Sequence, residues 1–419
     1  MIQQTKLNNG IQVVTDTIAH VETVSLGAWF GVGARYESAA ENGLSHVLEH
    51  MAFKGTENRT ALEISSAIES VGGYLNAYTS REATAYYARI LKEDLSLTVD
   101  VLGDILQNSL FADVELDKEK KVILQEIAMT QDTPDDIVFD YFQETCYPNQ
   151  ALGRSILGPA ENVRGFTPDQ VRAFMNKHYS THNMVFSAAG KVDHDVVVQQ
   201  VEKAFIGFQT HTPPEKESAQ YSGGSCRMVK DLEQVHLVLG FQGVSLGHPD
   251  YYTQMLAATI MGGGMSSRLF QEIREKRGLV YGISAFGQCH KDTGVFGIYA
   301  ATDPSDVANL LPAVGSVCSD AIHQITLQEL DRAKAQIKAA LLMGMESTTQ
   351  RCERLAHHIL NYGEVIDIQK IVHKIEAMSV EMIQNYLKNA LNTPLTLTGL
   401  GKVEGLPDYD VCQGYFKAL

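Results

Sequence analysis

Two histidines and a glutamate lie one helical turn apart in the segment His46-Val47-Leu48-Glu49-His50. At 3.6 residues per turn, His46, Glu49 and His50 share one face of a helix, and apolar residues occupy the opposite face. Two imidazoles at this spacing can bind one metal ion, and a glutamate beside them can accept a proton from a metal-bound water. This combination would support metal-assisted hydrolysis, although the motif alone also fits a solvated helix face.

A catalytic zinc usually has three protein ligands, so the motif requires a further donor. The best candidate lies in the segment 116–127, where a helix would place Glu119 and Glu126 two turns apart on one side, among apolar residues such as Val122. A carboxylate on a buried face is costly unless a cation meets it. A metal ion would be that cation for Glu126, and pairing with a buried arginine is the alternative for either glutamate.

These residues resemble the pitrilysin-type (M16) zinc metallopeptidases, in particular the small two-domain branch that includes the beta subunit of the mitochondrial processing peptidase and its bacterial relatives. In that family the third zinc-binding glutamate follows the last histidine of the motif by 76 residues, which is the step from His50 to Glu126. The likeness continues through Asn76–Glu82, Leu152–Gly158 and Arg274–Tyr281, so it covers nearly the whole chain.

The resemblance implies one Zn²⁺ per chain, bound by His46, His50 and Glu126. It makes Glu49 the general base, and Glu119 a carboxylate that orients and tunes the site from behind the ligands. The implied activity is that of a zinc metalloendopeptidase of the inverzincin type, which hydrolyses extended peptides or presequence-like segments.

The length of 419 residues exceeds what one core usually supports and predicts two domains. We expect an N-terminal zinc-binding catalytic domain at 1–206, a linker at 207–226 and a homologous C-terminal domain at 227–419 that completes the substrate chamber. Each half opens with a β-rich segment, continues with helical sequence and then has a strand-like run: Val24–Val32 and Tyr74–Arg89 in the first half, Val235–Val244 and Leu279–Thr302 in the second. The pattern predicts an α+β fold of two similar domains from an internal repeat, each a largely antiparallel sheet packed with helices. The resemblance adds a clamshell chamber.

The second half has three glycines, Gly262, Gly263 and Gly264, where the first half has its histidine motif. Glycines let a backbone approach a ligand closely, and the resemblance places such a segment at the border of the substrate chamber; a plain flexible connection is the alternative. Arg274 should end a helical run and Tyr281 should begin the next strand. By spacing alone Arg274 would lie on a solvated face, but the resemblance implies that both side chains reach the substrate near the scissile bond and stabilise its oxyanion.

The run Tyr74–Arg89 alternates apolar and polar residues, and an exposed edge there could add a substrate peptide as an extra strand. Asn76 and Ala77 match the family's substrate-binding edge, whereas an ordinary internal strand is the alternative. Phe53 resembles the family's aromatic wall beside the metal, and a core phenylalanine is the alternative for this residue.

Acidic residues cluster at the start of a predicted helix after Pro134. Helix capping and the helix dipole explain most of them. Asp136 and Asp140 stand four residues apart, where like charges repel, and they match the acidic pair with which the processing peptidase recognises an arginine near the cleavage site. We therefore expect a preference for basic, arginine-containing peptides.

The formal net charge of −16 argues against nucleic acid as a partner, because phosphate binding requires a basic face. Six scattered cysteines signal neither a disulfide framework nor a cysteine-based zinc site. No stretch is apolar enough for a membrane span, and the N-terminal residues do not form a leader sequence. A cytoplasmic bacterial protein is the simplest interpretation, and a mature organellar chain would look the same.

Three functional interpretations remain open for this chain. A self-sufficient peptidase, most simply a homodimer, is favoured because the zinc-binding set and the glycine, arginine and tyrosine elements all occur in one chain. A subunit that is active only beside a different chain is the second. The third is a non-catalytic core or scaffold subunit of a larger complex, of the kind that relatives form in a respiratory complex; such chains have usually lost part of the metal set.

Overall fold

The computed structural model describes residues 1–416 as two compact units, and each unit is drawn from three stretches of the chain. Unit 1 comprises 1–128, 154–217 and 342–365, and unit 2 comprises 129–153, 218–341 and the residues from 366 onward. The chain passes from unit 1 to unit 2 after Glu217, within the expected linker. However, two stretches of the expected domains belong to the compact unit of the other half, and β-strand structure begins at Gly224, before the expected end of the linker at residue 226.

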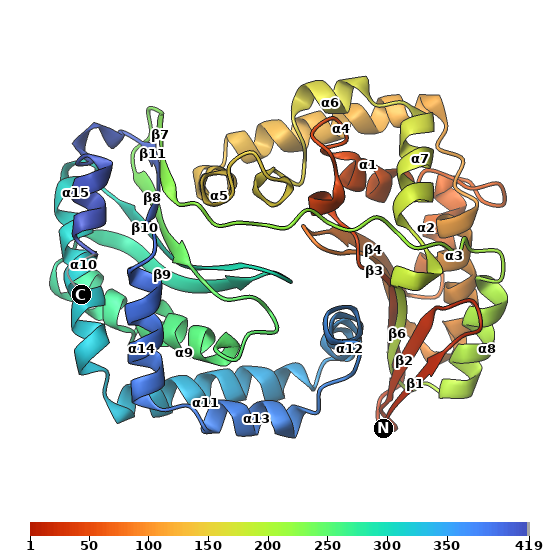
Figure 1. Ribbon diagram of the computed structural model, residues 1–419. Helices are drawn as coiled ribbons and strands as arrows, with labels where there is room; N and C mark the ends of the chain where they lie inside the picture. The colour runs from red at the N-terminus through yellow and green to blue at the C-terminus, as the bar shows by residue number, and fades with distance from the viewer. Residues whose placement is uncertain (417–419) are drawn as a thin grey trace. The chain divides into compact units, whose positions relative to one another are not determined.

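The sheet of unit 1 has six strands in the order β1-β2-β6-β3-β5-β4 (Figure 1). Only β2 and β6 run parallel; the other neighbours are antiparallel. The strands are β1 (Ile2–Lys6), β2 (Gln12–Thr17), β3 (Thr23–Phe30), β4 (Tyr74–Thr79), β5 (Thr84–Leu91) and β6 (Met184–Gly190). The expected run Tyr74–Arg89 is therefore a hairpin, and its first strand, β4, is an edge of this sheet.

The helices of unit 1 cover both faces of its sheet. They are η1 (Ala34–Tyr36), α1 (Leu44–Met51), α2 (Ala61–Glu69), η2 (Lys92–Asp94), α3 (Leu95–Gln107), α4 (Asp113–Gln131), α6 (Ala160–Gly165), α7 (Pro168–His178), η4 (Thr181–Asn183), α8 (His194–Ala204) and α12 (Thr348–Tyr362). The main core packs α1, α3, α7 and α8 against strand residues such as Leu26 and Phe30. On the opposite face, α12 packs against Trp29 and Val185 (Figure 1). This alternation follows from the two-residue period of a strand.

The sheet of unit 2 has five strands in the order β7-β11-β8-β10-β9. They are β7 (Gly224–Val229), β8 (Val235–Gln242), β9 (Val280–Cys289), β10 (Gly294–Thr302) and β11 (Thr396–Gly401), and only β7 and β11 run parallel. This is the order and direction of β2-β6-β3-β5-β4 in unit 1. The α+β fold and the internal repeat are thus confirmed.

The other elements of unit 2 are α5 (Pro134–Cys146), η3 (Ala151–Gly153), α9 (Tyr251–Gly262), the π-helix η5 (Phe270–Lys276), η6 (Pro304–Asp306), α10 (Val307–Gln324), α11 (Leu327–Gly344), α13 (Ile368–Glu376), α14 (Val380–Leu391), η7 (Val403–Gly405) and α15 (Tyr409–Gly414). Helices α9, α10 and α14 form the main core with one face of the sheet, and Phe142 of α5 packs with Val238 and Val295 on the other. Each sheet is therefore completed by one helix from the opposite half of the sequence: α12 in unit 1 and α5 in unit 2.

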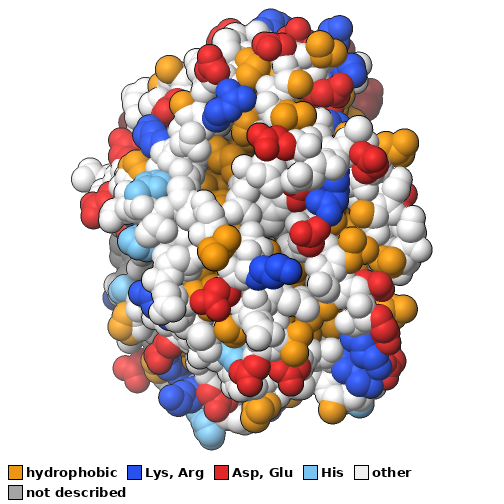
Figure 2. Space-filling view, turned by 90° about the vertical axis from the view of Figure 1, so that its right-hand side faces the viewer, with side chains coloured by type: hydrophobic (Ala, Val, Ile, Leu, Met, Phe, Trp, Pro, Cys, Tyr) orange, Lys and Arg blue, Asp and Glu red, His pale blue; other side chains and the backbone are white. Residues whose placement is uncertain are grey.

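Acidic and basic side chains are interspersed on the molecular face drawn in Figure 2, and no continuous basic area appears on that face. This agrees with the formal net charge of −16. Within residues 1–416, no helix combines the length and the apolar character that crossing a membrane requires.

Candidate metal centre

Helix α1 carries the histidine motif, and a buried carboxylate fixes where this helix begins. Gly43 precedes the helix with a φ of 105°, a conformation that favours glycine. The carboxylate of Glu37 accepts hydrogen bonds from the backbone N–H groups of Gly43 (2.9 Å) and Ser45 (2.6 Å) and from the side-chain amide of Asn42 (2.9 Å). It satisfies amide groups that the helix itself leaves unpaired, and these bonds oppose the rise in the pKa of Glu37 that burial causes. The turn that carries His46 is thereby held in place.

The ligand atoms of His46, His50 and Glu126 lie within 4.8 Å of one another. The Nε2 atoms of both histidines, from α1, are 3.7 Å from Oε2 of Glu126, from α4. These separations are too long for hydrogen bonds. They are a few tenths of an ångström more than the roughly 3.3 Å that separates two ligands of a tetrahedral zinc ion with bonds of about 2.0–2.1 Å. A zinc ion bound by the three atoms would satisfy all of them once they moved closer together.

The protonation state of His46 also fits a metal site. Burial lowers the pKa of His46 to about 4, so its ring is neutral and has a lone pair to donate near pH 7. The Nδ1 atom of His46 is buried, and no residue within 1–416 forms a hydrogen bond with it. The set of two imidazoles and one carboxylate is a ligand set that zinc commonly takes in hydrolytic enzymes.

Glu119 lies behind His50 and not among the converging ligand atoms. Its Oε2 accepts a hydrogen bond from Nδ1 of His50 at 3.0 Å, and its Oε1 pairs with Nζ of Lys54 at 2.7 Å. Burial alone would raise the pKa of Glu119, but the hydrogen bonds from Lys54 and His50 hold it below its ordinary value. The ionised carboxylate keeps the proton of His50 on Nδ1 and leaves Nε2 free to bind a metal.

The contact between Lys54 and Glu119 was not anticipated from the sequence. The cation that meets this buried carboxylate is Lys54, and not the buried arginine that we considered. Val122 also departs from the expected apolar stripe, because its side chain is exposed. Ile123 and Leu116 are buried as expected. The side of α4 that carries Val122 therefore faces solvent, while the side that carries Ile123 packs into the core.

Glu49 points to the same side of α1 as the histidines and is held by a residue that the sequence reasoning missed. The hydroxyl of Thr79, at the end of β4, donates a hydrogen bond of 2.6 Å to Oε2 of Glu49. Burial raises the pKa of Glu49, and the bond from Thr79 opposes this only in part. A carboxyl group with a raised pKa is suited to accept and return a proton near neutral pH. The one signal for Thr79 in the sequence is its position inside the segment Asn76–Glu82, which carries the family resemblance.

We predict that Thr79→Val lowers kcat by roughly 10- to 100-fold, because a hydrogen bond to a charged group contributes about 1.5–3 kcal/mol and each 1.36 kcal/mol is a factor of ten. Valine has the shape of threonine without the hydroxyl. Steady-state kinetics would measure the change, and zinc content should stay at the wild-type value. Thr79→Ser is the matched control, which keeps the hydroxyl and should recover most of the activity. A wild-type kcat for Thr79→Val would show that this bond does not position Glu49.

Three further predicted residues of unit 1 lie on or near the hairpin β4–β5. Asn76 is exposed on the edge strand, and its side chain bonds to Tyr74, whereas Ala77 is buried and faces the core. Phe53 is partly buried against the main core, with its ring 6.2 Å from that of Tyr86. The alternative of a core phenylalanine is therefore supported for Phe53. The alternative of an internal strand does not hold for β4 within the sheet of unit 1.

In unit 2 the structure brings Arg274 and Tyr281 together. The guanidinium of Arg274 lies 4.5 Å from the ring centre of Phe270 and 5.6 Å from that of Tyr281, and Tyr281 itself is 79% exposed. Arg274 lies in the π-helix η5, a conformation that is frequent at functional sites. Gly278 follows this helical run with a φ of 65°, and its N–H bonds to the carbonyl of Arg274.

The three glycines of unit 2 differ in their surroundings. A Cβ at Gly262 would lie 2.1 Å from the backbone nitrogen of Ala285, and one at Gly263 would lie 2.7 Å from Cα of Thr259. Close packing of the end of α9 against β9 therefore requires glycine at position 262. Flexibility of the connection, considered above, does not explain this glycine. Gly264 has open space where its Cβ would be.

The acidic pair lies on α5, in unit 2. Asp136 is exposed and Asp140 is half-buried, one turn apart on the helix that Pro134 begins. The expected side-chain cap is absent at Thr133, because its hydroxyl donates to the carbonyl of Met129.

Comparison with known proteins identifies the family. A family model described as Insulinase (Peptidase family M16) matches residues 12–160, and one described as Peptidase M16 inactive domain matches residues 165–337. An uncharacterized zinc protease of Rickettsia felis is 40% identical over 93% of this chain and 95% of its own. A probable mitochondrial-processing peptidase subunit beta of Arabidopsis thaliana is 34% identical over 97% of this chain and 79% of its own.

Among solved structures, a protease from Helicobacter pylori superposes with a TM-score of 0.90 at 21% identity, over 96% of this chain and 99% of the other. That likeness concerns the fold. The two family models cover most of the sequence, and the relatives match it over nearly its whole length. The chain that holds His46, His50 and Glu126 together in unit 1 is therefore a member of peptidase family M16.

Proposed function

We propose that this protein is a zinc-dependent endopeptidase that hydrolyses extended peptides or presequence-like segments. The observation that carries the proposal is the convergence of two imidazoles and a carboxylate, with Glu49 on the same face of α1. Relatives that are named zinc proteases support it. A zinc ion in this site would polarise the scissile carbonyl and make a bound water acidic enough to attack near neutral pH.

The residues around the centre have separate tasks in this proposal. Glu49 takes a proton from the attacking water and later delivers it to the leaving amine, while Thr79 holds the carboxylate in one orientation. Glu119 keeps His50 in the tautomer whose Nε2 can bind metal. From the family resemblance, we assign to Arg274 and Tyr281 the task of gripping the substrate backbone and stabilising the oxyanion.

The edge strand β4 offers a sequence-tolerant way to bind a peptide. One side of β4 pairs with β5, and within the sheet of unit 1 no strand pairs with its other side. An extended peptide can add to such an edge through main-chain hydrogen bonds. Asn76 and Ala77 lie on this edge, and Thr79, at its end, contacts Glu49, so a peptide bound there would pass close to the base.

We propose that the enzyme prefers substrates with a basic residue near the cleavage site, which Asp136 and Asp140 would bind. We predict that the double variant Asp136→Asn/Asp140→Asn raises KM for arginine-containing peptides by about tenfold or more, since a charge-assisted hydrogen bond contributes about 1.5–3 kcal/mol. Peptides with citrulline in place of arginine have the same shape without the charge, and the variant should cleave them as the wild type does. Equal loss on both peptides, or no loss on either, would contradict the proposed preference.

Two alternatives to a self-sufficient peptidase are each supported by one comparison. The name of the Arabidopsis relative is that of a subunit, which favours a chain that acts beside a different partner. One of the two matching family models is described as an inactive domain, which is compatible with a scaffold role for the second half. A homodimer and a cytoplasmic location stay predictions.

A peptide library tests the proposed function directly. Purified protein loaded with zinc should cleave extended peptides at sites that mass spectrometry can read from the products. The same protein treated with a chelator should leave the library intact, and added zinc should restore cleavage. An intact library at every zinc concentration, with the metal bound, would favour the scaffold or partner-dependent alternatives.

A further inference from the structure

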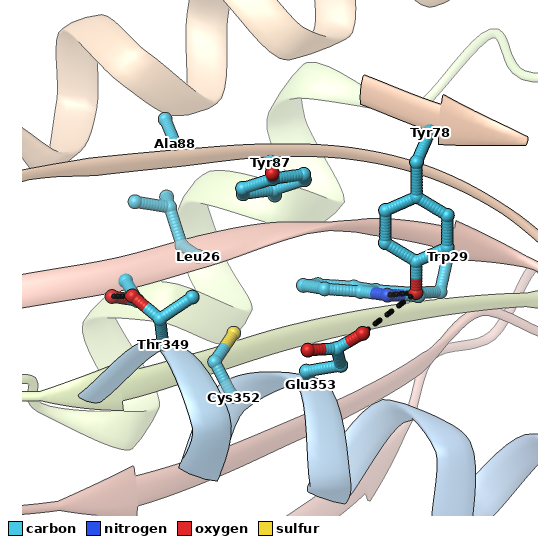
Figure 3. A pocket seen from close by; sticks show the side chains of 9 residues that line it. Leu26, Trp29, Tyr78, Tyr87, Ala88, Thr349, Cys352 and Glu353 are labelled. Atoms are coloured by element: carbon cyan, nitrogen blue, oxygen red, sulfur yellow. Dashed lines mark hydrogen bonds between the residues drawn. The ribbon is translucent and has the colours of Figure 1, made fainter. Parts of the chain in front are cut away.

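A small pocket lies in unit 1 between its sheet and α12, on the face opposite to α1 (Figure 3). Its volume is about 120 Å³, close to that of a cavity that holds one small organic group. The residues that line it come from β3, β4, β5 and α12: Ser25, Leu26, Trp29, Tyr78, Tyr87, Ala88, Thr349, Cys352 and Glu353. The metal centre and its supporting residues are not among them.

Three aromatic rings form one wall of the pocket. Tyr87 stacks on Trp29 with ring centres 6.5 Å apart, and Tyr78 is tilted against Tyr87 at 6.1 Å. The hydroxyl of Tyr78 accepts a hydrogen bond from the indole N–H of Trp29 at 3.2 Å and donates one to Oε1 of Glu353 at 3.1 Å (Figure 3). These bonds fix both rings and the carboxylate relative to one another, so the wall is preorganised.

Glu353 supplies the only formal charge in the lining. The imidazole of His357, whose Nε2 lies 3.6 Å from Oε1, lowers the pKa of this carboxylate, which is therefore ionised at neutral pH. Its recorded contacts within residues 1–416, with Tyr78 and His357, involve Oε1, and Figure 3 shows the second oxygen turned away from Tyr78. Neither lysine nor arginine belongs to the described lining. An ionised carboxylate beside the faces of a tryptophan and two tyrosines is the combination that recognises an organic cation.

The strand order connects this pocket to a bound peptide. Along β4, Ala77 faces the main core, whereas Tyr78 faces α12 and forms part of the pocket. A peptide added to the β4 edge would follow the same two-residue alternation. Alternate side chains would therefore lie on the α12 face beside Tyr78, within reach of the pocket for a long side chain.

We propose that this pocket binds the guanidinium or ammonium end of an arginine or lysine side chain of the peptide that pairs with β4. The proposal rests on the proposed peptidase function for the identity of the ligand. It assigns recognition of a basic residue to unit 1, through Trp29, Tyr78, Tyr87 and Glu353, separately from the acidic pair on α5.

The chain contains a single tryptophan, Trp29, so intrinsic tryptophan fluorescence reports on this pocket alone. We would titrate chelator-treated protein with N-acetyl-arginine amide and with N-acetyl-citrulline amide, which replaces the charged guanidinium by a neutral urea. The arginine compound should give a saturable fluorescence change, with a dissociation constant at least tenfold lower than that of the citrulline compound. This comparison needs no variant and no hydrolysis.

Glu353→Gln removes the charge and keeps the shape, and it should weaken arginine binding at least tenfold. Glu346→Gln is the matched control, since Glu346 is exposed just before α12 and outside the pocket, and it should leave the titration unchanged. Equal binding of the arginine and citrulline compounds, or no effect of Glu353→Gln, would overturn the proposal. If arginine binds as expected but zinc-loaded protein cleaves no peptide, the cation site stands and the proposed peptidase function fails.

Discussion

The Glu49→Gln variant should bind zinc like the wild type, and its kcat should be roughly a thousandfold lower. The amide of glutamine fills the same space and can still accept the hydrogen bond from Thr79, so the shape of α1 is preserved. It cannot accept a proton, and general acid–base catalysis contributes about 10²- to 10⁴-fold to a reaction rate. The raised pKa of Glu49, which burial causes, makes this carboxyl group an effective proton carrier near neutral pH.

Steady-state cleavage of a fluorogenic peptide, together with zinc content after dialysis, measures both parts of this expectation. Glu57→Gln is a suitable control because Glu57 is exposed and lies outside the ligand cluster. Its activity should equal that of the wild type. Full turnover by Glu49→Gln would refute the assignment of the base, and loss of zinc from this variant would show that Glu49 has a different role in the centre.

The second large effect is expected at Glu126, where substitution by glutamine should abolish stable zinc binding. Glutamine keeps the size but removes the negative charge that balances the ion, and it leaves only two imidazole ligands. Glu119→Gln should weaken zinc binding by only about 10- to 100-fold, since Glu119 acts through His50 and does not face the ion. The two glutamates lie two turns apart on α4, so this pair separates a ligand from a supporting residue.

Isothermal titration of zinc into metal-free protein gives the stoichiometry and affinity for each variant. The wild type should bind one equivalent, Glu119→Gln one equivalent more weakly, and Glu126→Gln none in the same concentration range. Glu115→Gln provides the control for the helix itself, because Glu115 lies on α4, pairs with Lys118 and is outside the ligand cluster. Equal affinities for Glu126→Gln and the wild type would remove Glu126 from the ligand set.

The parts of the centre that the sequence predicted are those set by local geometry. The spacing of His46, Glu49 and His50 within one helix needs only the 3.6-residue period, and the same period places Glu119 and Glu126 on one side of α4. The distance along the chain from His50 to Glu126 identified the third ligand through the family resemblance. The structure then brought the three ligand atoms together across two helices.

The contacts that the sequence did not predict depend on tertiary packing. Thr79 reaches Glu49 because the end of β4 lies beside α1, and Lys54 reaches Glu119 because α1 and α4 pack together. Neither pair of residues is separated by a helical or strand period in the sequence. The sequence therefore gives no indication that the two members of each pair are in contact. Gly262 likewise gave no sign that its role is the close contact of α9 with β9.

The division into compact units likewise depends on tertiary packing that the sequence did not predict. The repeated order of strands followed from the two β-rich segments and two strand-like runs in the sequence. The positions of α5 and α12 did not, because their apolar residues fit either sheet by periodicity alone. The consequence is functional, since α12 supplies Glu353 to the pocket of unit 1.

The most direct test of the central claim is a zinc titration of peptidase activity in metal-free protein. If His46, His50 and Glu126 form the catalytic centre, cleavage of a peptide library should rise in proportion to added zinc and level off at one equivalent per chain. Binding of one zinc equivalent without any cleavage, or cleavage that is indifferent to zinc, would contradict the account.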